Sequence, residues 1–596
     1  MKFKFLLLIF GFVLSSNVYA AFNVNDPTQY IRYWQNHIVN IDEFPKVRIA
    51  KKIFTQLLNT WNYNKKPLPP KLSIVHSQEG AWAASLEDGN ILLSLQALEL
   101  ILDDKINHAR DHMAFILAHE LAHQQSDDAW QFRFLRLAGT QTPETKKIMM
   151  NGVNIDSRFS EREIKADQDG LLLMVLAGFN PFSITNENNL FIRWTEAVWE
   201  ADCTSSKRTS VKQACFIAKS RSTRTQAQLH EISQKSLFYT LGLKMYVAGK
   251  YEIAREYFSA FEQSYPNHIV HDAIGLTFVA EVTKRISNKT HTNLHGFQFM
   301  YPVLLNTQAL PPAFKTPQKM RGIESEKFDE SLFNKISQAI PFFERAIQLN
   351  PTYKEAYYHL SICYLLQNNF YMARGILQGK FLNRFEKNDK VNMLLAITSA
   401  LEGKTQIAID ELVELSNKEQ FNSALKYNIV FNLSRLYERE NKFALANQTW
   451  KKLINIAKHR PDNVLLTLAI ANFKKQNVTS NNLPVNAVMI DGYTARQKRK
   501  VKASDKITTI WLNGNPIYYT LANDGSRFVM DHQQNIISAW HENRDTKPLQ
   551  KTQGLINTLG FPQRQINSNS GYFLAYDNYR LALNIENDEV KSWFIY

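Results

Sequence analysis

The chain lacks any apolar run long enough to cross a bilayer after residue 20. Its one strongly apolar run, 5–14, follows Lys2 and Lys4 and precedes small residues that end at Ala20. This order is typical of a secretory signal peptide cleaved after Ala20, and the run is too short for the alternative, an anchoring helix. Because no cysteine lies near the cleavage site, a bacterial lipid anchor is not expected either. We predict a mature protein that is soluble outside the cytoplasm.

Cysteine is scarce, with 3 in 596 residues. In an oxidising compartment the close pair Cys203 and Cys215 could close a short loop, which leaves Cys363 over. Cys363 falls on the apolar face of an expected helix. We interpret it as a small buried hydrophobic residue rather than as a reactive thiol.

Acidic residues are outnumbered, with 55 against 70 basic residues and a formal charge of +15. An excess of positive charge can indicate nucleic acid or an anionic membrane surface as partner, but secretion argues against nucleic acid. The densest basic run, 496–502, falls between two expected domains. We interpret it as a solvated linker, with contact to anionic lipid headgroups as the alternative.

The segment 113–123, Met-Ala-Phe-Ile-Leu-Ala-His-Glu-Leu-Ala-His, has the composition of a buried helix. On a helix, His119 and His123 are one turn apart and present both imidazoles to the same side. Zinc is bound by neutral imidazole nitrogens at about 2.0–2.1 Å, and a helix supplies two of them at a suitable separation. Glu120 then flanks the metal, where it can take a proton from the attacking water. The pattern predicts one zinc ion per chain and Glu120 as general base.

A third ligand is required, because a catalytic zinc takes three protein ligands and keeps one position open for water. The expected helix 160–176 offers Glu163, and Asp167 follows one turn later. A carboxylate at that place can accept the free N–H of a ligand histidine and fix its tautomer. A structural zinc or an accidental motif is the alternative. The predicted metal ligands are His119, His123 and Glu163, and the predicted catalytic residues are Glu120 and Asp167.

Two further features accompany these motifs, namely Gly170-Leu and the segment 177–181, Ala-Gly-Phe-Asn-Pro. Together they resemble the gluzincin family of metallopeptidases, which includes HtpX, the CAAX prenyl proteases and periplasmic BepA-like proteins. The resemblance covers roughly residues 70–235. It implies an α+β peptidase domain in which Glu163 is the third zinc ligand and Asp167 orients His119.

Two short alternating segments precede the motif. Residues 71–75 and 81–94 are expected to form strands, the second folded into a hairpin at Asp88-Gly89. In peptidases of this family the edge strand beside the metal pairs with the substrate backbone, and 82–86 is the candidate. Three residues replace the family's usual Asn-Ala-Phe and are predicted to bind substrate, namely Trp82, Ala83 and Ala84.

A second departure from the family lies in 222–232. The family places a histidine there and, six residues later, an arginine, whereas this chain has Arg224 and His230 in exchanged positions. Beside a metal, a cation and an imidazole could stabilise an oxyanion or contact the ion, so both residues are predicted to bind substrate. The alternative is that both belong to the surface of a helix.

His108 and His112 repeat the four-residue spacing of the metal-binding pair. No glutamate follows the first of them, and the stretch around them is polar. We therefore expect both to be exposed residues at the entry to the helix 113–123.

Between about residues 233 and 478 the chain becomes helical with a period of about 34 residues, the length of a tetratricopeptide repeat. Small and large apolar residues recur at corresponding positions, so that each unit buries its face by stacking on the next. They include Phe238, Leu241, Gly242, Ala254, Phe258, Ala339, Phe343, Ala346, Ala373, Ala408, Leu412, Ala446 and Trp450. We predict an α-solenoid with an inserted loop at 284–329 and a concave surface for a client or partner. The alternative is that the repeats only brace the peptidase.

After about residue 480 short alternating runs predict strands. The runs 507–512 and 517–521 are joined at Asn513-Gly514, a strong hairpin signal. A short helix is expected at 553–559, with further strands at 571–576, 579–585 and 590–595. This β-rich segment is interpreted as an added interaction module.

Taken together, the sequence predicts a mainly α protein with a signal peptide at 1–20, a zinc metallopeptidase domain at 21–232, a repeat solenoid at 233–478 and a β-rich module at 479–596. The expected function is a periplasmic zinc endopeptidase that acts on unfolded polypeptides, because pairing with an edge strand needs an extended backbone. By the resemblance to BepA-like proteins, its clients are outer-membrane proteins at their assembly machinery. The alternatives are a chaperone or assembly scaffold whose peptidase site is normally plugged, and a secreted protease that acts on a host.

Overall fold

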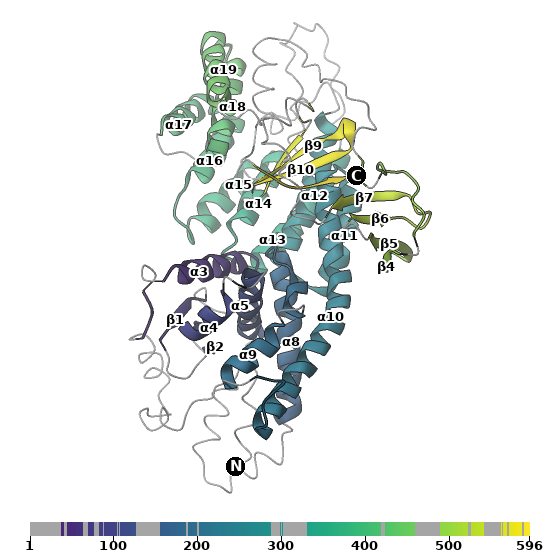
Figure 1. Cartoon of the computed structure of the whole chain (residues 1–596). Helices are drawn as coiled ribbons and strands as arrows, with labels where there is room; N and C mark the ends of the chain where they lie inside the picture. Colours follow the sequence, from purple (N-terminus) through teal and green to yellow (C-terminus); the bar gives the residue numbers. More distant parts are fainter. Residues whose placement is uncertain are drawn as a thin grey trace. The chain divides into compact units, whose positions relative to one another are not determined.

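The structure is a computed structural model in which helices predominate and a β-sheet lies at the C-terminal end of the chain (Figure 1). The residues it describes are 37–40, 44–62, 70–76, 81, 83–86, 89–103, 105, 108–126, 155–185, 189–199, 202–287, 299, 301, 330–418, 423–458, 489–490, 492–502, 504–522, 526–541, 559, 562, 564–568, 571–586 and 589–596. The expected signal peptide, 1–20, lies outside them. None of the described helices is both long and apolar enough to cross a membrane.

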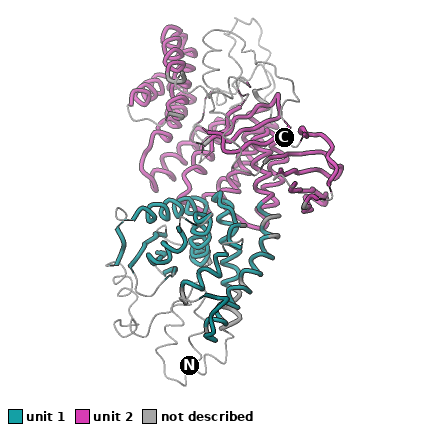
Figure 2. The backbone as a smooth tube through the Cα atoms, viewed as in Figure 1, with its two compact units in different colours: residues 1–236 teal, residues 237–596 magenta. Residues whose placement is uncertain are grey.

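The chain divides into two compact units, residues 1–236 and 237–596 (Figure 2). The second unit contains helix pairs together with the C-terminal sheet, which the sequence predicts as separate domains. The boundary falls inside the long helix α10, Thr209–Val247.

The first unit combines helices with a small sheet. Its further elements are α3 (Pro45–Leu58), β1 (Leu72–Val75), β2 (Ala83–Ser85), β3 (Ile91–Ser94), α4 (Leu95–Ile101), α5 (Ala109–Ser126), α8 (Ile155–Leu176), the 3-10 helix η1 (Pro181–Thr185) and α9 (Leu190–Trp199). The strand order is β1-β3-β2, with β1 parallel and β2 antiparallel to β3. The predicted hairpin is therefore confirmed, and the left-handed Gly89 (φ 91°) lies in its turn. β2 is an edge strand, as expected.

The core of this unit forms around α5. Six consecutive residues of this helix, 113–118, have no exposed surface. A helix that is apolar on all sides has to be covered on all sides, and α5 packs against α3, α4, β2, α8 and η1. The residues that follow 118 on the same helix are thereby held in a rigid setting.

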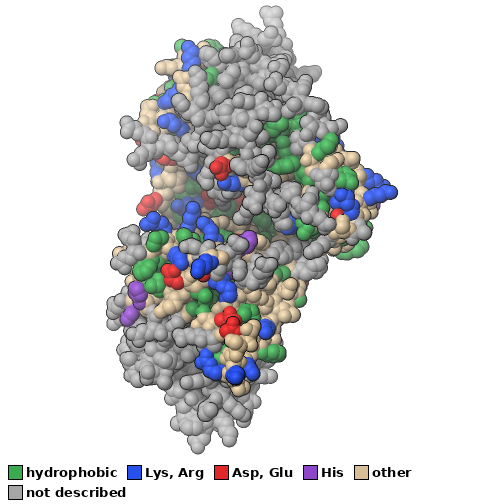
Figure 3. All heavy atoms as spheres, in the orientation of Figure 1, with side chains coloured by type: hydrophobic (Ala, Val, Ile, Leu, Met, Phe, Trp, Pro, Cys, Tyr) green, Lys and Arg blue, Asp and Glu red, His purple; other side chains and the backbone are tan. Residues whose placement is uncertain are grey.

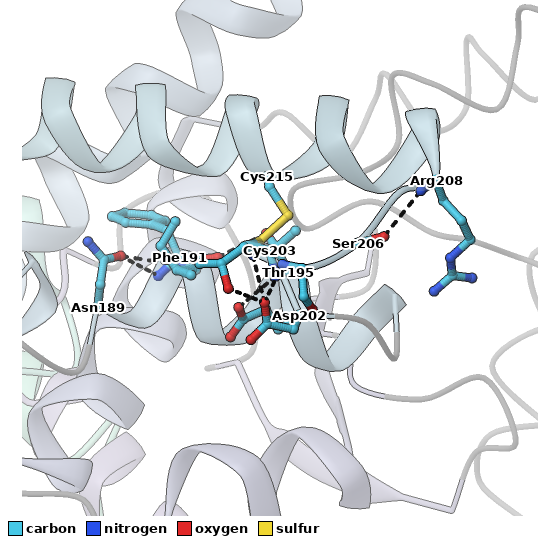
Figure 4. Close-up of a disulfide and its surroundings, with 12 residues drawn as sticks. Asn189, Phe191, Thr195, Asp202, Cys203, Ser206, Arg208 and Cys215 are labelled. Carbon is cyan, nitrogen blue, oxygen red and sulfur yellow. Dashed lines mark hydrogen bonds between the residues drawn. A yellow bond between two sulfur atoms is a disulfide. The ribbon is translucent and has the colours of Figure 1, made fainter.

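A disulfide joins Cys203 to Cys215 at the start of α10, with Cα atoms 5.6 Å apart (Figure 4). The loop it closes begins with a turn built on the Asp202 carboxylate, which accepts hydrogen bonds from the Thr204 hydroxyl and from the backbone N–H groups of Thr204 and Ser205. These bonds lower the pKa of Asp202 to about 2. The pairing that the cysteine spacing suggests is present, and Cys363 is buried and free, as predicted.

In the second unit, consecutive helices pack against one another. They are α11 (Tyr251–Ser264), α12 (His268–Ser287), α13 (Glu330–Leu349), α14 (Lys354–Leu366), α15 (Phe370–Arg374), the π-helix η3 (Gly375–Phe381), α16 (Asp389–Leu401), α17 (Thr405–Asn417), α18 (Ser423–Arg439) and α19 (Phe443–Lys458). A Cβ atom on Gly242 would lie 2.6 Å from the Phe258 ring, so the small residue lets the large one approach. α12 continues to Ser287, so the first residues of the inserted loop predicted at 284–329 are helical, and nearly all the rest of it lies outside the described residues.

The C-terminal sheet has eight antiparallel strands in the order β4-β5-β6-β7-β11-β10-β9-β8. They are β4 (Lys506–Leu512), β5 (Asn515–Leu521), β6 (Ser526–Met530), β7 (Ile536–His541), β8 (Arg564–Asn567), β9 (Tyr572–Tyr576), β10 (Leu581–Glu586) and β11 (Glu589–Ile595). The predicted strands are confirmed within a few residues. Nearly all of the helix expected at 553–559 lies outside the described residues.

The interpretation of 496–502 as a linker is wrong. The backbone of this run pairs with the start of β7, through a bridge between Lys498 and Asn535. Arg499 has no exposed surface, and its guanidinium binds the Asp505 carboxylate and lies 4.1 Å from the centroid of the Phe528 ring. One arginine of the run is thus part of the core, whereas the lysines on either side of it are exposed.

Candidate metal centre

The residues at the C-terminal half of α5 bring two imidazoles together. His119 and His123 are one helical turn apart, and their Nε2 atoms lie 3.1 Å from each other. His119 is fully buried, and His123 is partly exposed. The predicted pair therefore converges on one point at the edge of the buried helix.

The helix α8 adds a carboxylate at this point. Glu163 places Oε1 3.2 Å from Nε2 of His123 and Oε2 3.5 Å from Nε2 of His119. Ligand atoms held in a tetrahedron at about 2.0–2.1 Å from zinc lie about 3.3 Å from one another. The three observed separations scatter around this value. Among the described residues, these three form the one group of histidine, cysteine or acidic side chains with the geometry to hold a metal ion.

Asp167 lies behind the first histidine. Its Oδ1 is 2.9 Å from Nδ1 of His119, so it can accept the Nδ1–H proton and leave the Nε2 lone pair directed at the metal position. Burial lowers the pKa of His119, but its hydrogen bonds to Asp167 and Glu163 outweigh burial and raise the pKa above its ordinary value. Burial raises the pKa of Glu163, whereas hydrogen bonds to both histidines hold it well below its usual range. A carboxylate between two imidazole nitrogens is a set of donor atoms that suits a cation.

Gly170 sets how closely α8 approaches α5. A Cβ atom on Gly170 would lie 3.0 Å from the backbone nitrogen of His119 and 3.2 Å from its Cα atom. These atoms are backbone and cannot rotate away. Since Glu163, Asp167 and Gly170 follow at helical spacing along one side of α8, contact at Gly170 fixes the distance of both carboxylates from His119. The sequence motif indicates that Gly170 matters, but only the structure shows that it contacts the backbone of His119.

The N-terminal half of α5 is anchored by buried polar contacts, which corrects one expectation. His112 is fully buried rather than exposed, with Nε2 2.8 Å from the Ser183 carbonyl oxygen and Nδ1 3.4 Å from Nη1 of Arg193. Burial lowers the pKa of His112. The Asp111 carboxylate accepts a hydrogen bond from the backbone N–H of Asn180 at 3.0 Å. The Ala-Gly-Phe-Asn-Pro segment thus holds the start of the helix that carries the candidate ligands.

The edge strand β2 is fastened beside the candidate ligands. The Ser85 hydroxyl donates to the Glu120 carbonyl at 2.7 Å, and the Gln124 amide donates to the Leu86 carbonyl at 2.8 Å. Antiparallel pairing joins Leu86 and Ala84 to β3, which directs the backbone N–H and C=O groups of Ala83 and Ser85 to the other side. Within the described residues no strand occupies that side of β2.

For the remaining predicted site residues the structure gives less detail. Glu120 is buried next to His119 on α5. Trp82 lies outside the described residues. Arg224 is half-buried on α10, and of His230 only the helical backbone is described. The predicted substrate contacts of Trp82, Ala83, Ala84, Arg224 and His230 remain predictions.

No family model matches this chain, and no curated protein matches it. Sequence motifs and geometry are therefore the grounds on which a function can be argued.

Proposed function

We propose that the chain is a zinc-dependent endopeptidase of the gluzincin type. The observation that carries the proposal is the convergence of two imidazole nitrogens and a carboxylate at 3.1–3.5 Å, with Asp167 behind His119. Two histidines and one glutamate are a donor set of catalytic zinc sites, and three ligands leave a position open. A structural zinc site would have four protein ligands.

Each residue has a defined task in peptide hydrolysis. His119, His123 and Glu163 would hold one zinc ion. Such an ion would act as a Lewis acid and would lower the pKa of a bound water towards neutrality. Asp167 keeps the Nδ1 proton on His119 and so fixes the ring orientation. Glu120 accepts a proton from the attacking water and returns it to the leaving amine.

The substrate class follows from β2. Its outer edge, which no strand covers within the part of the chain that the structure describes, offers backbone donors and acceptors at Ala83 and Ser85, which an extended chain can pair with but a folded domain cannot. We therefore propose unfolded or misassembled polypeptides as substrates. The helix pairs of residues 237–458 support a tetratricopeptide-type solenoid that docks clients or partners. Periplasmic location and outer-membrane clients follow from the signal-peptide pattern and from the resemblance to BepA-like proteins.

The proposal is tested by zinc content and casein hydrolysis of the mature protein beside two variants. The wild type should hold one zinc ion per chain and cleave casein. Glu120→Gln should keep the metal and lose about two to four orders of magnitude in activity, the contribution of a general base. Glu163→Ala should lose both metal and activity. A wild type that binds no zinc would contradict the assignment.

A scaffold or chaperone role is a second candidate, favoured by the fact that residues 237–596 contain none of the candidate ligands. It predicts that Glu120→Gln restores outer-membrane protein assembly in a deletion strain as well as the wild type does. An endopeptidase role predicts that this variant fails there. Both proteins should be compared at equal expression.

A further inference from the structure

Ser85 of the edge strand β2 makes contacts in two directions. In a β-strand the backbone N–H and C=O groups lie in the plane of the sheet, and the side chain stands perpendicular to it. The backbone groups of Ser85 are directed to the outer edge of β2, where no strand lies in the part of the chain that the structure describes. Its hydroxyl is directed to α5 and donates a hydrogen bond to the Glu120 carbonyl at 2.7 Å. A chain paired with this edge would therefore bond the residue whose side chain holds Glu120.

This hydrogen bond is additional to the hydrogen bonds of the helix itself. In an α-helix the carbonyl of residue 120 accepts the backbone N–H of residue 124 and has a second lone pair that another donor can use. The Ser85 hydroxyl takes that place, so α5 can form without it. Glu120 is 3% exposed and Ser85 is half-buried. The bond thus sets the position of β2 against the turn of α5 that carries the candidate general base.

Two further bonds hold the same turn of α5, and neither involves the outer edge of β2. The buried Gln124 amide donates to the Leu86 carbonyl, where the chain leaves β2 for its hairpin turn. The indole N–H of Trp61, just after α3, donates to the Leu121 carbonyl at 3.0 Å. α3 buries its apolar side, and Lys and Arg side chains lie on the surface over it (Figure 3). These contacts anchor the turn, so a change at Ser85 is expected to shift β2 locally and to leave the helix in place.

Ser85 differs in this respect from the other residue of β2 with outward backbone groups. Ala83 faces the same side of the sheet as Ser85, but its side chain is a methyl group that cannot form a hydrogen bond. Among the described residues of β2, Ser85 alone combines outward backbone groups with a side-chain hydrogen bond to α5. Its hydroxyl is thus the hydrogen-bonded link between that edge and Glu120.

We infer that Ser85 is a positioning residue, which aligns an extended polypeptide bound to β2 with the general base Glu120. The inference rests on the proposed endopeptidase function. A general base must lie within hydrogen-bond reach of the proton it takes, and a displacement of about 1 Å can lower a rate by about a hundredfold. The Ser85 hydroxyl acts on this geometry through the backbone of Glu120 and not through the substrate or the metal. Its removal lowers kcat, whereas the substrate-binding edge and the ligands His119, His123 and Glu163 stay in place.

The test compares Ser85→Thr with Ser85→Val in the zinc-bound, mature full-length protein. Threonine and valine have almost the same shape and both suit a strand, but only threonine keeps a hydroxyl. The probe is an internally quenched peptide that contains a casein sequence cleaved by the wild type. Ser85→Val should lower kcat by about tenfold and change KM by less than about twofold, because the backbone groups that pair with the peptide remain. Ser85→Thr should keep kcat within about threefold of the wild-type value.

A control variant and a metal measurement accompany this pair. Thr55→Val removes a hydroxyl that also donates to a helix carbonyl, at 2.9 Å, but on the exposed side of α3. It should leave kcat unchanged. Zinc content and thermal unfolding are measured for every variant, and each should hold one zinc ion per chain, because the candidate ligands lie on α5 and α8.

The possible failures are distinct. Equal kcat for Ser85→Thr and Ser85→Val in an active, zinc-bound protein would overturn the inference and leave the proposed function standing. A loss of zinc from Ser85→Val, or an effect on KM alone, would also overturn it, since Ser85 would then support the metal centre or substrate binding instead. A wild type that neither binds zinc nor cleaves the peptide removes both the inference and the proposed function.

Discussion

Gly170 is the residue at which a single methyl group should matter most for the candidate metal centre. Its missing side chain lets α8 lie against the backbone of His119, with only 3.0 Å available for a Cβ atom. A methyl group there pushes the helices apart by a few tenths of an ångström. That displacement moves Glu163 and Asp167 away from the imidazoles, whose separations already match a tetrahedral site.

We therefore predict that Gly170→Ala weakens zinc binding by about tenfold or more, the usual effect of disturbing residues that orient metal ligands. Competition with a chromophoric chelator measures it. Gly375→Ala is the matched control, because a Cβ atom there meets nothing within 4 Å. Gly275→Ala would meet the Phe343 ring at 2.7 Å in the other unit, and should lower stability without changing zinc affinity. Equal zinc affinity for Gly170→Ala and Gly375→Ala would contradict the prediction.

At the residue scale, the sequence predicts what spacing on a helix determines. His119 and His123 lie one turn apart on one helix, as do Glu163 and Asp167 on another, so the pattern places each pair on one helix face without knowledge of the fold. The meeting of the two pairs depends on the tertiary contact of the helices at Gly170. The environment of His112 depends instead on Ser183 and Arg193, which approach it only through the tertiary fold. The polar residues next to His112 in the sequence favour an exposed side chain, whereas its contacts with residues distant in the sequence bury it.

At the element scale, the disulfide ties the start of α10 to the turn that follows α9. It closes a loop over a separation of 12 residues, and a cross-link of that length stabilises by about 3 kcal/mol in the chain-entropy description. Lys207, Arg208 and Lys212 are exposed within this loop. The backbone N–H of Cys203 also donates to the Glu196 carboxylate at 2.9 Å, which links the loop to α9.

Reduction, or Cys203→Ser with Cys215→Ser, should therefore expose this segment to trypsin while zinc content stays at the wild-type value. The candidate ligands lie on α5 and α8, outside the loop. Limited proteolysis with mass spectrometry locates the cuts, and Cys363→Ala serves as control because Cys363 is free and buried. If the oxidised and reduced proteins are cut at the same rate between residues 203 and 215, the loop owes its order to other contacts.

Elements with local signals were predictable and those with distant partners were not. The Asn513-Gly514 pair predicts the hairpin of β4 and β5, because the conformation of this turn depends only on neighbouring residues. The basic run 496–502 was misread because Arg499 finds its partners in Asp505 and Phe528 after the chain folds back. From composition alone, a run rich in lysine and arginine is expected to be exposed to solvent.

At the scale of the whole chain, the C-terminal strands form one sheet rather than two hairpin stacks. Strands β4 to β7 and β8 to β11 are each consecutive, and they are joined where Trp540 of β7 pairs with Phe594 of β11. This junction brings together residues far apart in the sequence, and no local pattern indicates it. It also provides the aromatic surface on which a half-buried lysine of α10 lies.

Lys244 of α10 is that lysine. Its Nζ atom lies 4.3 Å from the ring centroid of Trp540 and 4.1 Å from that of Phe594. Burial, aided by the charge of Arg527, lowers the pKa of Lys244 to about 7. In the unfolded chain a lysine has a pKa of about 10.4, so between these values the unfolded state binds more protons than the folded state. Burial of this group therefore destabilises the fold increasingly as the pH falls from about 10 to about 7, and its effect is constant below that range.

We predict that unfolding of residues 237–596 requires more urea as the pH rises from 7 to 9, with a contribution from Lys244 of up to about 1.4 kcal/mol per pH unit. Lys244→Met should remove this slope and raise stability at pH 7, because a neutral side chain no longer has to lose charge on burial. Lys591→Met, on an exposed lysine of β11, is the control and should keep the slope. Urea unfolding followed by tryptophan fluorescence measures both variants, since Trp540 reports on the junction itself. An unchanged slope in Lys244→Met would mean that the rings stabilise the charged ammonium enough to offset its burial, and that the sheet is held to α10 by a cation–π contact at every pH tested.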